Sequence, residues 1–124
     1  MITASHNPKE YNGFKICRNK TTIYGAEIQK IRQILDKGEF ASGTGNSEKL
    51  DIIPTYVDYI TDQVRIKPGL KIMIDTGNGT CGPIIDKVMR KIKADYDILY
   101  KEPDGNFPNH LADPTVVEHI TTLI

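Results

Sequence analysis

The chain has 124 residues, of which 39% are hydrophobic and 26% are charged, which suits a soluble globular protein with an adequate core. Lysine plus arginine equals aspartate plus glutamate at 16 each, so no net charge attracts nucleic acid or an anionic membrane. No apolar run approaches the roughly 20 residues of a membrane helix, and the opening residues lack the pattern of a secretory leader. We therefore expect a cytoplasmic protein that binds neither nucleic acid nor membranes.

The first stretch with chemical potential follows a short apolar run, residues 1–4, and reads Ser5-His6-Asn7-Pro8. Pro8 disfavours the α region at Asn7, and serine and asparagine favour local turns, so these residues predict a loop that presents Ser5. An exposed serine beside a histidine suggests a nucleophile, although most such pairs are ordinary turn residues. The dipeptide alone does not decide between catalysis and a turn.

A strand is predicted directly after this loop. Asn12-Gly13 is a turn signal, and the alternation in residues 14–16 predicts a strand with Lys15 on the face opposite its apolar neighbours. A hairpin-like return would bring the Lys15 ammonium back beside Ser5.

Residues 25–37 predict an amphipathic helix that stops at Gly38. Its apolar residues recur on one side at helical spacing: Ile28, Ile31, Ile34 and Leu35. Residues 42–47 are small, polar and aperiodic, which predicts a boundary between two structural units.

A second helix is predicted over residues 51–66, with Asp51 as N-cap and Pro54 in the first turn. Its apolar stripe consists of Ile53, Val57, Ile60 and Val64. Pro68-Gly69 is expected to end it.

The rest of the chain has the pattern of a βαβ unit, the building block of parallel sheets. Residues 70–74 predict a strand whose large apolar side chains suggest a sheet covered on both faces. A glycine-rich turn, a helix over residues 83–93 and a strand over 97–101 follow. A last helix is expected over residues 115–124.

Gly77, Gly79 and Gly82 match the spacing of a dinucleotide-binding fingerprint. Asp75 at the strand end would repel a pyrophosphate, yet acidic residues that could bind a ribose lie about 20 positions further on: Asp95, Asp97 and Glu102. Close packing of strand against helix is the favoured role of the turn, and a dinucleotide-binding module stays open as an alternative.

The two cysteines, Cys17 and Cys81, form neither a Cys-x-x-Cys nor a Cys/His pattern. Zinc binding and a disulfide framework are therefore not expected. Free cysteine behaves as a small hydrophobe, so we expect both side chains to be buried.

Two separated motifs carry a resemblance to a known family. Residues 3–8, followed at this spacing by residues 12–15, resemble the active-site serine loop of the α-D-phosphohexomutases, the phosphomannomutase and phosphoglucomutase family. Residues 104–110, Asp-Gly-Asn-Phe-Pro-Asn-His, with Asp113-Pro114, resemble a loop in that family's second domain. The resemblance runs over nearly the whole chain, which would be about a quarter of a full-length member.

The resemblance implies an α/β fold with three-layer α/β/α mixed-sheet units, truncated at both ends. Residues 1–47 would be the C-terminal part of domain I with the catalytic serine loop, and residues 48–124 the N-terminal part of domain II. The family reaction moves a phosphoryl group between the 1- and 6-positions of a hexose phosphate through a phosphoserine, so hexose phosphate and hexose bisphosphate are the implied partners.

By the same resemblance, Ser5 would be phosphorylated and would be one ligand of Mg²⁺. His6 and Lys15 would take part in catalysis, and Asn7 and His110 in substrate binding. His119 lies in a helical pattern and is expected at the surface.

The carboxylate-rich metal loop of the family does not occur in this sequence. We therefore expect the chain alone to be inactive. A non-catalytic fragment that self-associates as a homo-oligomer through exposed sheet edges is a further alternative.

Overall fold

The computed structural model describes residues 1–124, which divide into two compact units. Unit 1 consists of Met1–Ser5 and Asn12–Lys49, and unit 2 of His6–Tyr11 and Leu50–Ile124. Residues 39–52 have no regular structure, which includes the predicted boundary at 42–47. None of the helices has the length and apolar character needed to cross a bilayer.

Unit 1 begins with an antiparallel return of the chain, which the sequence predicted. Ile2 forms an isolated bridge with Phe14, and the Thr3 N–H donates to the Gly13 carbonyl at 2.8 Å. A Cβ on residue 13 would collide with the Thr3 carbonyl, so glycine permits this close approach. In place of the predicted strand over residues 14–16 the structure has only this bridge, and the regular strand pairing starts at Cys17.

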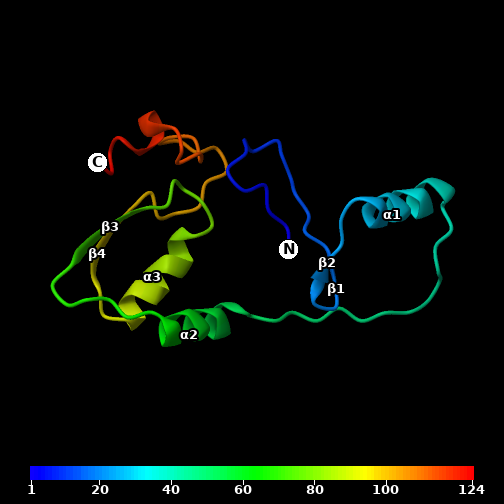
Figure 1. Ribbon diagram of the computed structural model, residues 1–124, viewed down its shortest axis with the longest axis horizontal. Coiled ribbons are helices and arrows are strands. Elements are labelled where there is room, and N and C mark those ends of the chain that lie inside the picture. Colours follow the sequence, from blue (N-terminus) through cyan, green and yellow to red (C-terminus); the bar gives the residue numbers. More distant parts are fainter. The chain divides into compact units, whose positions relative to one another are not determined.

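The regular pairing in unit 1 is antiparallel, between β1 (Cys17–Arg18) and β2 (Thr21–Thr22). The helix α1 (Ala26–Lys37) follows and confirms the predicted amphipathic helix (Figure 1). Gly38 ends it in the left-handed region at φ 68°, with its N–H directed to the carbonyls of Ile34 and Leu35. No residue of α1 is buried, so its apolar side is uncovered in this chain.

Unit 2 begins its regular structure with α2 (Ile53–Gln63). The N-cap is Ile52, so the prediction of Asp51 as N-cap is wrong by one residue; the Asp51 carboxylate still accepts the Ile53 N–H at 3.1 Å, and Pro54 lies in the first turn as predicted. The helix ends at Gln63, three residues before the predicted end, because Val64 is already extended. Val57, from the predicted stripe, is only 6% exposed.

The βαβ unit predicted from the sequence is present. The strand β3 (Lys71–Asp75) pairs in parallel with β4 (Asp95–Leu99), and α3 (Gly82–Lys91) connects them (Figure 1). The register joins Lys71 to Asp95 and Asp75 to Leu99, so β4 begins two residues before its predicted start. The α/β fold class expected for the chain is therefore confirmed.

Helix α3 packs on β4, and α2 packs on α3. Val88 of α3 is 4% exposed, whereas Met73 of β3 is 46% exposed. The expectation of a sheet covered on both faces is therefore wrong within this chain. A single crossover helix can cover only one face of the two strands it connects.

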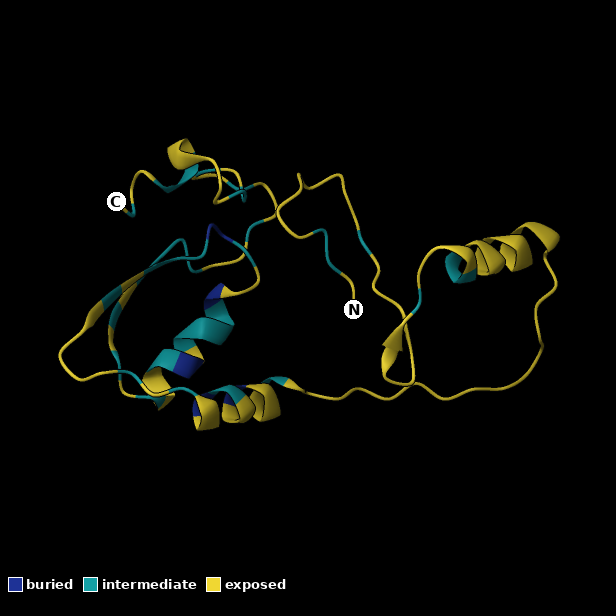
Figure 2. Ribbon diagram, viewed as in Figure 1, coloured by how far each residue is buried: buried dark blue, intermediate teal, exposed yellow.

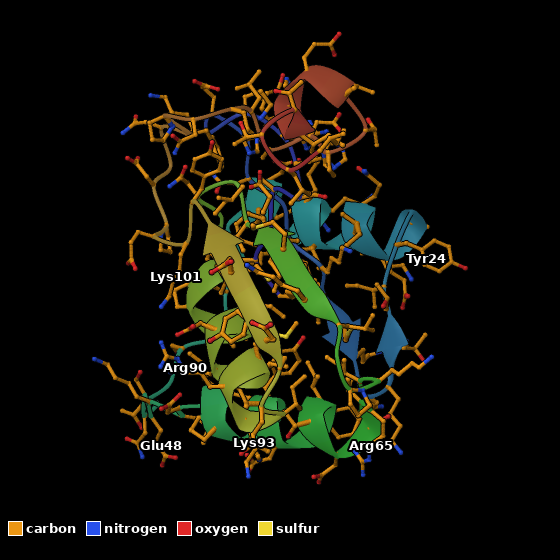
Figure 3. The ribbon with its side chains drawn as sticks, turned by 90° about the vertical axis from the view of Figure 1, so that its left-hand side faces the viewer. Tyr24, Glu48, Arg65, Arg90, Lys93 and Lys101 are labelled. Atoms are coloured by element: carbon orange, nitrogen blue, oxygen red, sulfur yellow. The ribbon has the colours of Figure 1, made fainter.

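A polar cluster fastens α3 to β4. The Asp86 carboxylate accepts hydrogen bonds from Lys101 at 2.9 Å, from the Tyr96 hydroxyl at 2.7 Å and from Arg90 at 3.0 Å. Lys101, followed by Tyr96 and Arg90, holds the pKa of the Asp86 carboxyl well below its usual range. The Asp86 hydrogen bond in turn raises the pKa of Tyr96. Figure 3 labels Arg90 and Lys101 among the side chains of this unit.

The predicted helix over residues 115–124 is wrong. The structure has only the short 3₁₀ helix η1 (Val117–Ile120) there. Asp113 competes for the backbone at this point, because its carboxylate accepts the Thr115 N–H at 3.0 Å and forms a local turn.

The predicted burial of the two cysteines is also wrong. Both thiols are free and exposed. Cys17 lies in a two-residue strand whose residues are both exposed, and Cys81 lies at the N-cap of α3.

Candidate functional site

Ser5 lies in an exposed loop, as the sequence predicted. Its backbone is in the left-handed region at φ 57°, and its N–H donates to the Thr3 hydroxyl at 3.0 Å. A non-glycine residue in that region is strained by about 1 kcal/mol or more, and such strain clusters at functional sites. The local hydrogen bond to Thr3 offsets part of this strain.

The antiparallel return places Lys15 opposite Met1. The Lys15 N–H donates to the Met1 carbonyl at 2.9 Å, and the Met1 amino group donates to the Lys15 carbonyl at 2.9 Å. Lys15 thus pairs with Met1, which lies four residues before Ser5 in the chain, and is not directly opposite Ser5. Its action beside Ser5 stays a prediction.

A pocket of about 310 Å³ lies in unit 2, and its lining begins with the residue that follows Ser5 in the chain. Three residues that follow the serine form one part of its lining: His6, Asn7 and Pro8. The remainder comes from the C-terminal part of the chain: Phe107, Leu111, Ala112, Asp113, Val116 and His119. A largely apolar cavity with a few convergent polar groups is typical of a small-molecule site, and this volume is at the lower end of such sites.

Residues 6–8 of the first motif therefore lie in the same compact unit as the second motif. Besides lining the same pocket, these segments are joined by Lys9, which directly follows residues 6–8 and whose ammonium donates to the Asn106 side-chain carbonyl at 3.0 Å. These residues are 97 positions apart in the chain. Of the five predicted site residues, His6 and Asn7 line the pocket, and Ser5 directly precedes His6 in the chain.

His119 is half-buried and lines the pocket, a role that the sequence did not indicate. Its Nδ1 donates to the Asp113 carbonyl at 2.8 Å, and its ring stacks on His110 with centroids 6.3 Å apart. No sequence signal pointed to it, because a helical pattern was expected where the chain instead forms a turn around Asp113. The Thr115 hydroxyl and N–H, which donate to the Asp113 carboxylate, hold the pKa of Asp113 below its usual value.

His110 lies behind the pocket rather than in its lining. One ring nitrogen, Nε2, faces both carboxylate oxygens of Asp75 at 3.1 and 3.2 Å, and Nδ1 donates to the Leu111 carbonyl at 2.8 Å. The hydrogen bond to Leu111, followed by that to Asp75, raises the pKa of His110 against the effect of burial. With both nitrogens engaged, substrate binding by His110 stays a prediction.

The glycine-rich turn after β3 is occupied by structural contacts. Asp75 accepts the Gly77 N–H at 2.8 Å, and the Asn78 N–H donates to the Tyr100 carbonyl at 2.9 Å. A Cβ on Gly82 would collide with the Lys101 carbonyl, so that glycine lets α3 approach the end of β4. These contacts favour packing over dinucleotide binding, since the Gly77 and Asn78 amides already donate to acceptors within the protein.

Asn78 connects this turn to the second motif. It is 9% exposed, and its side chain donates to the Glu102 carbonyl at 2.9 Å and accepts from the Asn109 amide at 2.7 Å. The pocket-forming loop is therefore attached to the βαβ unit by buried polar contacts.

A magnesium site is not complete in this chain. No three histidine, cysteine, aspartate or glutamate side chains gather in a metal-binding arrangement. Mg²⁺ requires near-octahedral oxygen coordination, and Ser5 with a single side-chain oxygen does not fit that need alone.

Known proteins are similar to this sequence over its whole length. The profile described as phosphoglucomutase/phosphomannomutase, alpha/beta/alpha domain I matches residues 1–42, and that of domain II matches residues 54–124. The chain belongs to the phosphoglucomutase/phosphomannomutase family. The resemblance inferred from the two motifs is thus confirmed.

Two curated relatives illustrate the match. The chain is 40% identical to a phosphomannomutase/phosphoglucomutase of Pseudomonas aeruginosa over 124 residues and 40% identical to a phosphoglucomutase of Neisseria gonorrhoeae over 126 residues. Both alignments cover 100% of this chain and 27% of the relative. The chain therefore spans about a quarter of the length of these relatives.

A solved structure agrees with the fold. The crystal structure of a phosphoglucomutase/phosphomannomutase family protein from Burkholderia thailandensis is 35% identical, with a TM-score of 0.90. The match covers 99% of this chain and 27% of that protein.

Proposed function

We propose that this chain supplies the serine loop of a phosphohexomutase, which moves a phosphoryl group between the 1- and 6-positions of a hexose phosphate. The observation that carries the proposal is the pocket in unit 2, whose lining combines residues 6–8, directly after Ser5 in the chain, with residues of the second motif. Family membership supports the reaction class, and the complete active site requires the parts of a full-length protein that this chain does not contain.

Ser5 is the phosphoryl carrier in this proposal. In the first half-reaction the bond between phosphorus and Ser5 Oγ breaks, and a bond from phosphorus to a sugar hydroxyl oxygen forms. The hydroxyl proton passes to the general acid/base, for which Lys15 is the candidate, and the same group supplies the proton that the departing Ser5 Oγ takes up. In the second half-reaction the other phosphoryl group of the hexose bisphosphate returns to Ser5 by the reverse steps.

His6 and Asn7 bind and orient the sugar phosphate in the proposal, because both line the pocket and directly follow Ser5 in the chain. Phosphoryl transfer depends mainly on positioning and on neutralising charge, and an imidazole and an amide can donate hydrogen bonds to phosphate oxygens. The residues of this chain do not fit Mg²⁺ by themselves, so the roles given to Ser5, His6 and Lys15 do not depend on the ion.

The proposal is tested by phosphorylation of the full-length protein that carries this chain. After incubation with a hexose bisphosphate, intact-mass analysis is expected to show one added phosphate, which is absent in Ser5→Ala. Mutase activity is expected to fall at least about 10³-fold in that variant, as for loss of a covalent nucleophile. Ser42→Ala, in the irregular segment 39–52, is the matched control and should keep both properties.

Two outcomes would contradict the assignment. One is equal labelling of Ser5→Ala and the unmodified protein. The other is mutase turnover by the 124-residue chain alone, because this chain corresponds to only 27% of the length of its relatives.

Lys15→Met is expected to keep its phosphate but to transfer it about 10²- to 10⁴-fold more slowly, as for loss of a general base.

A further inference from the structure

Asp75 and His110 form a buried ion pair behind the pocket. Asp75 ends β3, and its side chain is 3% exposed, compared with 15% for His110. A carboxylate at that depth is costly unless it is paired and hydrogen-bonded. Two contacts meet that requirement: the His110 Nε2, and the Gly77 N–H at 2.8 Å.

The contacts of the ring define its charge. The partners of the two ring nitrogens are a carboxylate and a backbone carbonyl, and both of these accept hydrogen bonds. Both nitrogens therefore carry a proton, which makes His110 an imidazolium. The ring lies over Gly77, where an added Cβ would be 3.1 Å from its Cε1 atom.

The ion pair reaches the pocket along two routes. The Leu111 carbonyl, held by His110 Nδ1, belongs to a residue of the pocket lining. The His119 ring, which also lines the pocket, stacks on the His110 ring at an interplanar angle of 18°. Breaking the ion pair therefore removes support from two residues of the same pocket wall.

Two further rings, those of Tyr100 and His119, contact the His110 ring, and the titratable groups nearest to His119 are Asp113 and the pocket residue His6. Tyr100, just after β4, meets the His110 ring edge-on at 5.4 Å between centroids. His119 comes from η1, and Asp113 precedes it; His6 lines the pocket that His119 shares. Asp75 is the carboxylate in direct contact with the His110 ring.

We infer that Asp75 and His110 are positioning residues that hold the pocket wall of Leu111 and His119 in place only while His110 is protonated. The inference rests on the proposed function for its kinetic consequence alone. In a phosphohexomutase, a loosened wall weakens substrate binding and leaves the phosphoryl-transfer chemistry at Ser5 largely intact. The expected signature is a KM that rises with pH while kcat changes little.

The structural arm of the test is histidine ring NMR of the full-length protein with selectively labelled imidazoles. His110 is expected to titrate above an ordinary histidine, and Asp75→Asn to lower its titration midpoint. The His119 ring signals should change when His110 titrates and should lose that response in Asp75→Asn. The matched control is Asp97→Asn, because Asp97 is an exposed aspartate paired with Lys71 in the same sheet and should leave both responses unchanged.

The kinetic arm measures KM and kcat for a hexose phosphate across the pH range of the His110 titration. Asp75→Asn is expected to give a several-fold higher KM at low pH and to abolish the rise with pH, and Asp75→Glu to restore part of it. A purely structural defect would instead reduce activity equally at every pH, which would overturn the inference. Circular dichroism confirms that each variant is folded, and Asp75→Glu is the fallback if Asp75→Asn is not.

The two arms separate the inference from the proposed function. If the full-length protein has no mutase activity, the proposed function fails while the NMR arm still decides the ion pair. If His110 titrates like an ordinary histidine, or if the His119 signals ignore its titration, the inference fails whatever the activity.

Discussion

The two units contain amphipathic helices of the same kind but differ in how much of them is buried. In unit 2, Val57 of α2 and Val88 of α3 are 6% and 4% exposed. In unit 1, Ile34 and Leu35 on the apolar side of α1 are 51% and 60% exposed. Figure 2 shows buried residues on α2, on α3 and in the turn after β3, and none on α1.

The difference lies in what each helix has to pack against. Unit 2 has two five-residue parallel strands joined by a crossover helix, which must lie on the sheet it connects. Unit 1 has two-residue antiparallel strands, too short to offer a face to α1. Apolar periodicity alone therefore does not bury the apolar side of a helix. Burial also requires a sheet in the same unit that is long enough for the helix to pack on.

The largest effect on this contrast is expected from Gly82→Ala. The added Cβ collides with the backbone carbonyl of Lys101, which cannot rotate away, so we expect a loss of about 3 kcal/mol of unfolding free energy. Gly43→Ala is the matched control in unit 1, where a Cβ meets nothing within 4 Å, and should change stability by less than about 0.5 kcal/mol. Urea unfolding measures both, and equal effects would contradict the packing described for unit 2.

An intermediate effect is expected from truncating an apolar side chain in each unit. Val88→Ala removes methyl groups from the core and should cost about 2 kcal/mol. Ile34→Ala removes a larger group from an exposed position and should cost about 0.5 kcal/mol or less. If Ile34→Ala proves the more destabilising in urea unfolding, α1 is covered in solution, and self-association of the chain, which stays a prediction, would be the first explanation to examine by light scattering.

A smaller effect is expected from the charges, and it depends on pH. The folded-state pKa of Asp86 is lowered, so its stabilisation is present above the unfolded pKa, near 4, and is lost as the pH falls below that value. Asp86→Asn should therefore cost about 1–2 kcal/mol at neutral pH, and the difference from the unmodified chain should shrink in acid. Asp36→Asn, which removes an exposed ion pair with Arg32 on α1, should cost about 0.5 kcal/mol or less at any pH. A constant effect of Asp86→Asn between pH 7 and about pH 2 would show that its charge is not responsible.

Local patterns in the sequence were sufficient for much of the fold. Apolar periodicity predicted the helices α1, α2 and α3, and Gly38 predicted the end of α1. The order of strand, turn and helix predicted the parallel pair of β3 and β4. The two sequence motifs by themselves indicated the family. Each of these features is set by neighbours within a few residues, where spacing and turn chemistry are directly visible.

The tertiary structure decided what lies in the pocket and what does not. His119 belongs to the pocket lining because the Asp113 turn replaces the predicted helix. His110 is not part of that lining, and its ring contacts Asp75, 35 residues earlier in the chain. The exposure of Cys17, Cys81 and Met73 likewise depends on which faces are covered within the chain. Composition and spacing by themselves determined helices, turns and family, because those depend on local geometry. The Asp75–His110 pair and the meeting of both motifs depend on contacts between distant residues, which no local pattern specifies.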